Sequence, residues 1–218
     1  MNKIETIMKI TIGCDESLKG DTFGGVVCAG FYYNSECSED LEHSGIRDSK
    51  KLSDNVINYL YTTEIKKKHP DNFYVVNIKS EEYNKLIKTK NITQILIDSY
   101  IEIISNIIQK IKIKHKNASI EIVVDEFPGA KKLNEVFPNA VITTKAESKY
   151  IQVAAASIIA RHYALKQINE LTKKAGFKIP LGSTHVSEAI LKLINETNDK
   201  RVLSKFLKTD FKNVKKLI

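Results

Sequence analysis

The sequence has few cysteines and no long apolar run, and both absences exclude classes of protein. Its three cysteines are Cys14, Cys28 and Cys37, and no two of them form a Cys-x-x-Cys pair. An odd number without that spacing argues against a disulfide framework and against a structural zinc site. No apolar run approaches the roughly 20 residues that a membrane-spanning helix needs. We therefore expect neither structural zinc nor a membrane partner.

Several common sequence signals are missing as well. There is no Gly-x-Ser-x-Gly turn of a serine hydrolase and no phosphate-binding loop of a nucleotide hydrolase, so we expect no small-molecule cofactor. Lys3, Glu5 and Lys9 place charges where a secretory signal would be apolar, which predicts a cytoplasmic protein. No internal repeat or linker interrupts the 218 residues, so we expect a single domain over 1–218.

The charge is strongly unbalanced toward lysine. Lys and Arg number 34 against 26 acidic residues, which gives a net charge of +8 and a pI near 9.2. A lysine-rich solvated surface would explain this balance without any partner. A basic chain whose acids gather at one place would instead suit a polyanionic substrate held around a metal centre.

The acids do gather after the first apolar run. Residues 10–14 lead into adjacent carboxylates at Asp15 and Glu16, followed by Lys19-Gly20 and a glycine pair at 24–25. Carboxylates at a strand end, beside backbone that can approach a ligand closely, suit a hard divalent cation that holds phosphate oxygens. An Asp-Glu step in a surface loop is the alternative, so the rest of the chain must decide.

Hydrophobic periodicity predicts an α/β protein. The expected strands are 8–14, about 25–33, 73–79, 120–125 and 140–144, with a loop over 34–46. The expected helices are 53–68, 81–87, 92–114, 131–137, 145–174 and 184–194, with Ser53, Ser80 and Ser183 as N-caps. This order predicts a mixed five-stranded sheet flanked by helices, with residues 175–218 as a helical C-terminal appendage.

Four carboxylates sit where strands end or the next helices begin, and they are Asp15, Glu16, Asp125 and Glu147. If the strand over 120–125 lies parallel to the first strand, Asp15 and Asp125 emerge side by side at the edge where open α/β sheets place their sites. Several oxygen ligands at one edge could hold two divalent cations and leave positions for phosphate and water. Glu126 is expected to point outward, and Cys14 to be a small core residue.

Three motifs resemble the type 2 ribonucleases H, and more closely ribonuclease HIII than HII. They are Gly13-Cys-Asp-Glu-Ser-Leu-Lys-Gly20, Arg47-Asp-Ser-Lys-Lys-Leu52, and Lys145-Ala-Glu-Ser148 followed by Ala155–Arg161. Glu147, the segment Ile179–Ser183 and Phe211-Lys212 are similar to the HIII pattern. The resemblance covers residues 9–213 and implies a ribonuclease H-like fold. It also implies hydrolysis of the RNA strand of RNA–DNA hybrids to 5′-phosphate and 3′-hydroxyl ends, with two Mg²⁺ or Mn²⁺ ions.

The resemblance also implies roles for residues of this chain. Asp15, Glu16, Asp125 and Glu147 would be the catalytic metal ligands. The substrate-binding residues would be Ser17, Leu18, Lys19, Gly20, Lys50, Lys51, Lys145 and Ser183. Two other functions stay open, a catalytically weak hybrid-binding homologue and a DNA-acting nuclease of the wider superfamily.

Two features depart from the family pattern. Family members carry glycine at the position of Leu18, in a loop whose backbone contacts ribose 2′-hydroxyls. If that position needs a positive φ, a leucine there costs free energy or moves the loop. Ribonuclease HIII also usually carries an N-terminal substrate-binding domain, whereas this sequence begins almost at the first strand.

Overall fold

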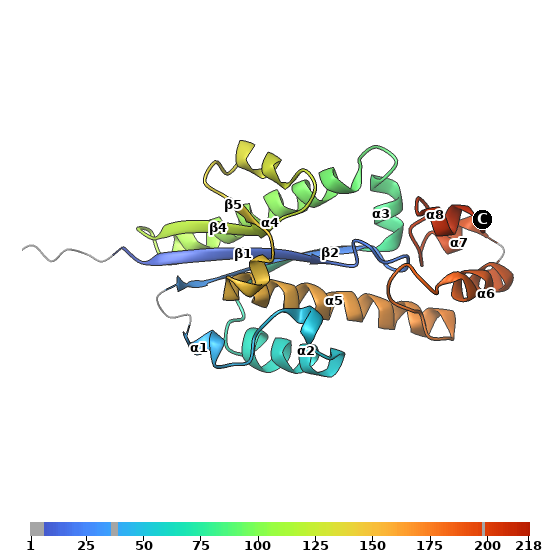
Figure 1. Cartoon of the computed structure of the whole chain (residues 1–218), viewed down its shortest axis with the longest axis horizontal. Helices are drawn as coiled ribbons and strands as arrows, with labels where there is room; N and C mark the ends of the chain where they lie inside the picture. Colours follow the sequence, from blue (N-terminus) through green and yellow to red (C-terminus); the bar gives the residue numbers. More distant parts are fainter. Residues whose placement is uncertain (1–6, 36–38, 198) are drawn as a thin grey trace, which may run out of the picture.

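A five-stranded mixed sheet forms the centre of the protein, in a computed structural model that describes residues 7–35, 39–197 and 199–218. The strands are β1 (Lys9–Ser17), β2 (Val26–Asn34), β3 (Phe73–Ile78), β4 (Ser119–Asp125) and β5 (Val141–Thr143). Their order is β3-β2-β1-β4-β5 (Figure 1). The predicted mixed five-stranded sheet is therefore confirmed. Cys37, one of the three cysteines, lies outside the described residues.

The sheet mixes antiparallel and parallel pairs. A short loop joins β1 to β2, which pair antiparallel, and β2 is also antiparallel to β3 although residues 35–72 separate the two strands. In contrast, β4 pairs in parallel with both β1 and β5. The parallel register sets Cys14 opposite Val124, so Asp15 and Asp125 are the next residues on neighbouring strands. The two acids thus lie side by side near the ends of their strands, as the sequence predicted, although β1 runs on to Ser17 and does not end at residue 14.

Helices cover both faces of the sheet (Figure 1). One face carries α4 (Ile92–Lys114), whose isoleucines pack with alternate residues of β1 and β2. The other face carries α5 (Ile151–Ala175), with α2 (Asp54–Leu60) beyond it. Ser53 caps α2 as predicted, and the helix continues as a π-helical segment over Tyr61–Lys66. None of the helices in the described ranges is long and apolar enough to cross a membrane.

The backbone of α5 lies directly against β1. A Cβ atom on Gly13 would lie 2.3 Å from both the carbonyl carbon of Gln152 and the amide nitrogen of Val153. The small residues at 154–156 and 160 are buried and let the rest of the first half of α5 pack against the sheet. This contact fixes where the polar side chains of α5 emerge beside the end of β1.

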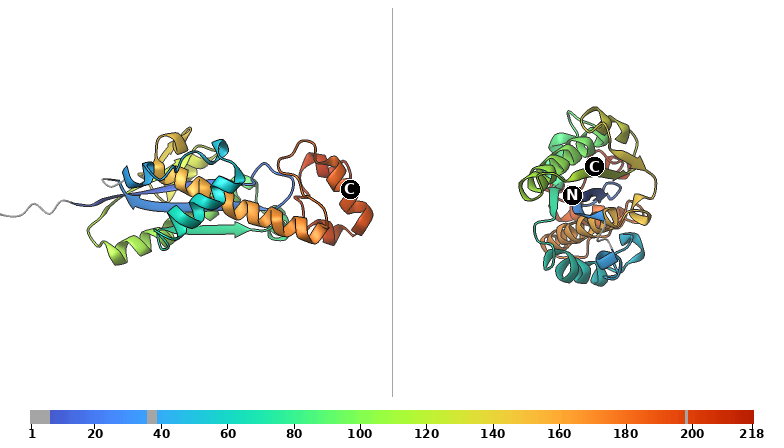
Figure 2. Two further views of the ribbon diagram at one scale, coloured as in Figure 1. Left: turned by 90° about the horizontal axis from the view of Figure 1, so that it is seen from below. Right: turned by 90° about the vertical axis from the view of Figure 1, so that its left-hand side faces the viewer.

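The C-terminal segment lies at one end of the molecule and packs back onto the loop after β1 (Figure 2). It contains α6 (Ser187–Thr197), α7 (Lys200–Leu203) and α8 (Lys212–Lys215). A β-bridge joins Phe23 to Leu207, and the amide of Thr22 donates to the carbonyl of Gly182 at 2.9 Å. The predicted helical appendage is present, and it supports the loop that follows β1.

Several predicted boundaries are wrong for local reasons. Ser80 is the first residue of α3 (Ser80–Leu86) and not its cap. Ser183 does not cap a helix. Positive φ angles at Gly182 and His185 are incompatible with a helix that starts at residue 184, and α6 begins only at Ser187.

Two other segments also differ from the prediction. The predicted loop over 34–46 contains a short helix, α1 (Glu39–Glu42). The helix predicted over 131–137 is a 3-10 helix over Ala130–Glu135.

Candidate active site

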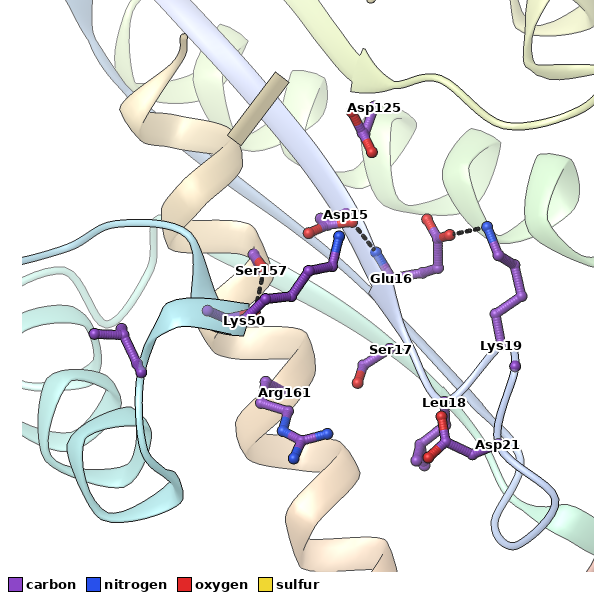
Figure 3. Close-up of a pocket in the computed structure, with 13 residues that line it drawn as sticks. Asp15, Glu16, Ser17, Leu18, Lys19, Asp21, Lys50, Asp125, Ser157 and Arg161 are labelled. Carbon is purple, nitrogen blue, oxygen red and sulfur yellow. Dashed lines mark hydrogen bonds and ion pairs between the residues drawn. The ribbon is translucent and has the colours of Figure 1, made fainter. Parts of the chain in front are cut away.

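A cavity of about 490 Å³ opens where β1 ends. Its lining comes from β1 and the following loop, from the turn before α2, from β4 and from α5 (Figure 3). The lining residues are Asp15, Glu16, Ser17, Leu18, Lys19, Gly20, Asp21, Ser49, Lys50, Leu52, Asp125, Ser157 and Arg161. Segments far apart in the sequence therefore meet in one charged hollow.

Asp15 and Glu16 point in opposite directions, because neighbouring residues of a strand face opposite sides of the sheet (Figure 3). Asp15 is buried at 8% exposure, and its Oδ1 accepts a hydrogen bond from the Glu16 amide at 2.8 Å. Glu16 receives hydrogen bonds from Lys19 Nζ on one carboxylate oxygen and from Tyr100 Oη on the other. Both oxygens of Glu16 are thus already bonded, on the side away from Asp15.

A hydrogen bond to the Asp125 side chain ties β4 to the turn that carries Glu147, which is not among the residues that line the cavity. Asp125 Oδ1 accepts from the amide of Ala146 at 2.9 Å, which ties the end of β4 to a 3-10 turn over Ala146–Ser148. Glu147 lies on that turn, and not at the start of the long helix as predicted, because α5 begins at Ile151. Its Oε2 is buried and has no hydrogen-bond partner. A buried carboxylate oxygen without a donor is costly unless a cation reaches it.

The electrostatics of the cavity favour a bound cation. Burial raises the pKa of Asp15 to about 8, the charge of Glu16 adds to this rise, and hydrogen bonds from Ser157 and the Glu16 amide oppose it. Burial lowers the pKa of Lys50, but the charges of Asp15, Glu147, Asp48 and Asp125 outweigh that effect, so its net pKa is raised. The carboxylates therefore act together to stabilise the positive charge of the Lys50 ammonium group.

The donor set suits a hard divalent cation, since carboxylate oxygens are the ligands that Mg²⁺ and Mn²⁺ prefer. Within the described ranges, no three carboxylate, imidazole or thiol groups are already placed to hold one ion together. Glu16 accounts for part of this, because it is turned toward Lys19 and Tyr100. The backbone brings Asp15, Glu16 and Asp125 to one edge, and an ion held by all three would require the Glu16 side chain to turn inward.

The predicted substrate residues divide into two groups. Ser17, Leu18, Lys19, Gly20 and Lys50 line the cavity. The other three lie elsewhere: Lys51 is near Asp48, 3.9 Å away, Lys145 is exposed before the 3-10 turn, and Ser183 is exposed in the loop before α6.

Leu18 adopts the left-handed conformation that glycine would occupy without strain. Its φ is +65°, and its side chain is buried at 2% exposure. A left-handed L-residue costs about 1–2 kcal/mol. The leucine therefore keeps the glycine-like backbone, and the burial of its side chain offsets part of that cost.

Sequence reasoning missed some residues of the site. Ser157 and Arg161 of α5 both line the cavity, and Ser157 exchanges a hydrogen bond of 2.6 Å with Ser49. Their signal was two polar residues four apart in a helix of small apolar residues, which places them on one face. Tyr100, which holds Glu16, has no comparable signal, because an aromatic residue on an apolar helix face is normally part of the core.

Cys14 is confirmed as a core residue. It is fully buried, and burial raises the pKa of its thiol well above the usual range. A thiol in this state supplies no nucleophile.

Comparison with known proteins identifies the family of the chain. The family model described as ribonuclease HII matches residues 12–214. Ribonuclease HIII of Phytoplasma mali is 33% identical over 94% of this chain and 71% of its own, and that of Ureaplasma parvum is 34% identical over 96% and 67%. The chain thus spans about 70% of the length of these relatives.

Solved structures give the same result. The crystal structure of Bst-RNase HIII in complex with Mn²⁺ superposes with a TM-score of 0.83 at 26% identity, and covers 97% of this chain and 70% of its own. Aquifex aeolicus RNase H3 gives a TM-score of 0.70 at 32% identity, over 92% of this chain and 71% of its own. The chain therefore belongs to the type 2 ribonucleases H and is similar to ribonuclease HIII, in a family of metal-dependent endoribonucleases that act on RNA–DNA hybrids.

Proposed function

We propose that Asp15, Glu16, Asp125 and Glu147 hold two Mg²⁺ or Mn²⁺ ions and that this chain hydrolyses the RNA strand of an RNA–DNA hybrid there. The observation that carries the proposal is the buried, unpartnered Oε2 of Glu147 beside the Asp125–Ala146 hydrogen bond, at the edge where Asp15 also emerges. When bound, the ions would activate the attacking water and stabilise the leaving 3′-oxygen.

The chain's own residues would bind and orient the scissile phosphate. Asp15 and Asp125 would be the central carboxylate ligands of the ions, and Glu16 and Glu147 would complete the ligand set. Lys50 and Arg161 lie on the wall of the same cavity and would contact phosphate oxygens as cations. Lys51, Lys145 and Ser183 would act only at more distant nucleotides, because they are exposed outside that wall.

The loop Ser17–Gly20 would distinguish RNA from DNA. It lines the cavity together with Asp15 and Glu16, and its Leu18 keeps the left-handed backbone. A ribose 2′-hydroxyl can be recognised by backbone groups at close approach, and deoxyribose offers none. We also infer that residues 1–218 form one catalytic unit, because Leu18, Ile190, Leu203 and Val214 belong to the same buried cluster.

A cleavage assay tests this function. With a 5′-labelled RNA–DNA hybrid and Mg²⁺ or Mn²⁺, we expect cuts within the RNA strand that leave 3′-hydroxyl and 5′-phosphate ends, and a chelator should abolish them. Glu147→Gln should lower the rate about 100-fold, because one ligand charge is lost. Glu126→Gln is the matched control, since Glu126 follows Asp125 but is exposed, and its rate should stay within about two-fold.

The same assay separates the alternatives. Tight binding of the hybrid without cleavage by the unaltered chain would indicate the binding homologue. Cleavage of a DNA duplex of the same sequence would indicate the DNA-acting nuclease. Equal loss in Glu147→Gln and Glu126→Gln would show that the assigned carboxylate has no special role.

A further inference from the structure

A fully buried lysine of the C-terminal segment lies beneath the loop that follows β1. The side chain of Lys208 is 0% exposed, and its Nζ donates one hydrogen bond to the carbonyl of Leu18 at 2.8 Å and another to the carbonyl of Asp21. The amide of Asp21 also donates to the carbonyl of Leu18, at 3.1 Å. One amine thus joins both ends of the turn over residues 18–21.

The surroundings of Lys208 leave its amine few other partners. The rings of Tyr83 and Phe211 lie 5.3 and 5.2 Å from Nζ. Burial lowers the pKa of Lys208 to about 7, against the opposing charges of Asp21 and Asp210. A buried amine is destabilising unless it is hydrogen-bonded, so the two carbonyls of the turn are what make this position tolerable.

The turn is one that needs support. Leu18 is left-handed at φ +65°, which an L-residue resists. Its side chain is held in the core from one side, and Lys208 holds its carbonyl from the other. The backbone of Lys208 is itself fixed, because its amide donates to the carbonyl of Thr22 at 2.9 Å.

We propose that Lys208 is a positioning residue for strand selectivity, because it fixes the turn after β1 in the conformation that contacts the ribose 2′-hydroxyls. This inference rests on the proposed function of the loop Ser17–Gly20. Lys208 itself touches no substrate. Its effect passes through the carbonyls of Leu18 and Asp21, so it should act on recognition of the RNA strand and not on the carboxylates.

The test replaces the amine and keeps the bulk of the side chain. Lys208→Met retains an apolar chain of similar length between the two rings and removes both hydrogen bonds. We expect the KM for the RNA–DNA hybrid to rise about ten-fold, which corresponds to the loss of one hydrogen bond to the substrate, and kcat to change less than about two-fold. The inhibition constant of a DNA duplex of the same sequence should not change, because that duplex has no 2′-hydroxyl.

A second lysine variant controls for charge. Lys116→Met also removes one positive charge, but Lys116 is exposed before β4, at the opposite end of that strand from Asp125. Both its KM and its inhibition constant should equal those of the unaltered chain. An unchanged KM in Lys208→Met would overturn the proposal. A fall in kcat alone would also overturn it, because a merely structural role lowers the amount of active enzyme, and so the apparent kcat, without changing KM.

Two further measurements keep the inference testable. If Lys208→Met does not fold, Lys208→Gln, which keeps a shorter polar group, takes its place with the same readouts. Hydrogen exchange on the unaltered chain needs no variant, and the Asp21 amide should be protected by about 100-fold or more even without substrate. Free exchange of that amide would overturn the inference, whereas failure of the unaltered chain to cleave hybrids would instead overturn the proposed function.

Discussion

Asp15→Asn is expected to lower the rate of hybrid cleavage by about 1000-fold or more, without unfolding the protein. The substitution keeps the shape of the side chain and removes the charge at the centre of the site, where Asp15 lies next to Asp125 on the neighbouring strand. The measurement is the single-turnover rate on an RNA–DNA hybrid in saturating Mn²⁺. A variant that keeps more than a tenth of the original rate would remove Asp15 from the mechanism.

The same variant should be more stable than the unaltered chain when no metal is present. Burial raises the pKa of Asp15 to about 8 in the folded state, whereas an unfolded aspartate titrates near 3.8. Between these values the folded state binds more protons, so the free energy of unfolding falls as pH rises from about 4 to 8. Asp15→Asn removes this dependence, and we expect it to gain roughly 1–3 kcal/mol at pH 8.

Thermal unfolding in chelator at pH 5 and pH 8 measures that effect. The unaltered chain should lose stability relative to Asp15→Asn as pH rises, and added Mn²⁺ should restore it only where Asp15 is present. Parallel pH dependence of the two proteins would contradict the assignment of a strongly raised pKa to Asp15.

Gly13→Ala is expected to destabilise the fold by about 3 kcal/mol, which for this chain length lowers the melting temperature by roughly 6–12 °C. The new methyl group would lie 2.3 Å from backbone atoms of Gln152 and Val153, so α5 must move away from β1. Because Ser157 lies on α5 beside Asp15, cleavage should weaken with stability.

Gly20→Ala is the control for this prediction. A Cβ atom on Gly20 meets no atom within 4 Å, and its stability should change by no more than about 0.5 kcal/mol. Denaturant unfolding of both variants is the measurement. Equal stability of Gly13→Ala and the unaltered chain would show that α5 is less tightly packed on β1 than described.

The sheet and the position of its carboxylates could be predicted from the sequence because both follow from local patterns. Apolar runs of strand length ended at Asp15 and Asp125, and a parallel pairing was enough to bring them to one edge. Helix boundaries near Ser183 could not be predicted in the same way. They depend on the positive φ angles of Gly182 and His185, and His185 gives no sign of one in the sequence.

The other features of the site that the sequence did not predict are contacts between residues far apart in the sequence. The hydrogen bond from Tyr100 to Glu16 joins residues 84 positions apart, and that from Lys208 to Leu18 joins residues 190 apart. Neither tyrosine nor lysine is unusual where it stands in the sequence. Their roles depend on tertiary packing, which periodicity and spacing do not encode.

The most direct test is an anomalous-difference map from crystals of the unaltered chain grown with Mn²⁺ and a hybrid whose RNA strand resists cleavage. We predict two manganese peaks in the cavity, with oxygens of Asp15 and Asp125 bound and Glu147 Oε2 turned onto one of the ions. Manganese absent from that cavity, or bound without any of these three carboxylates, would contradict the account.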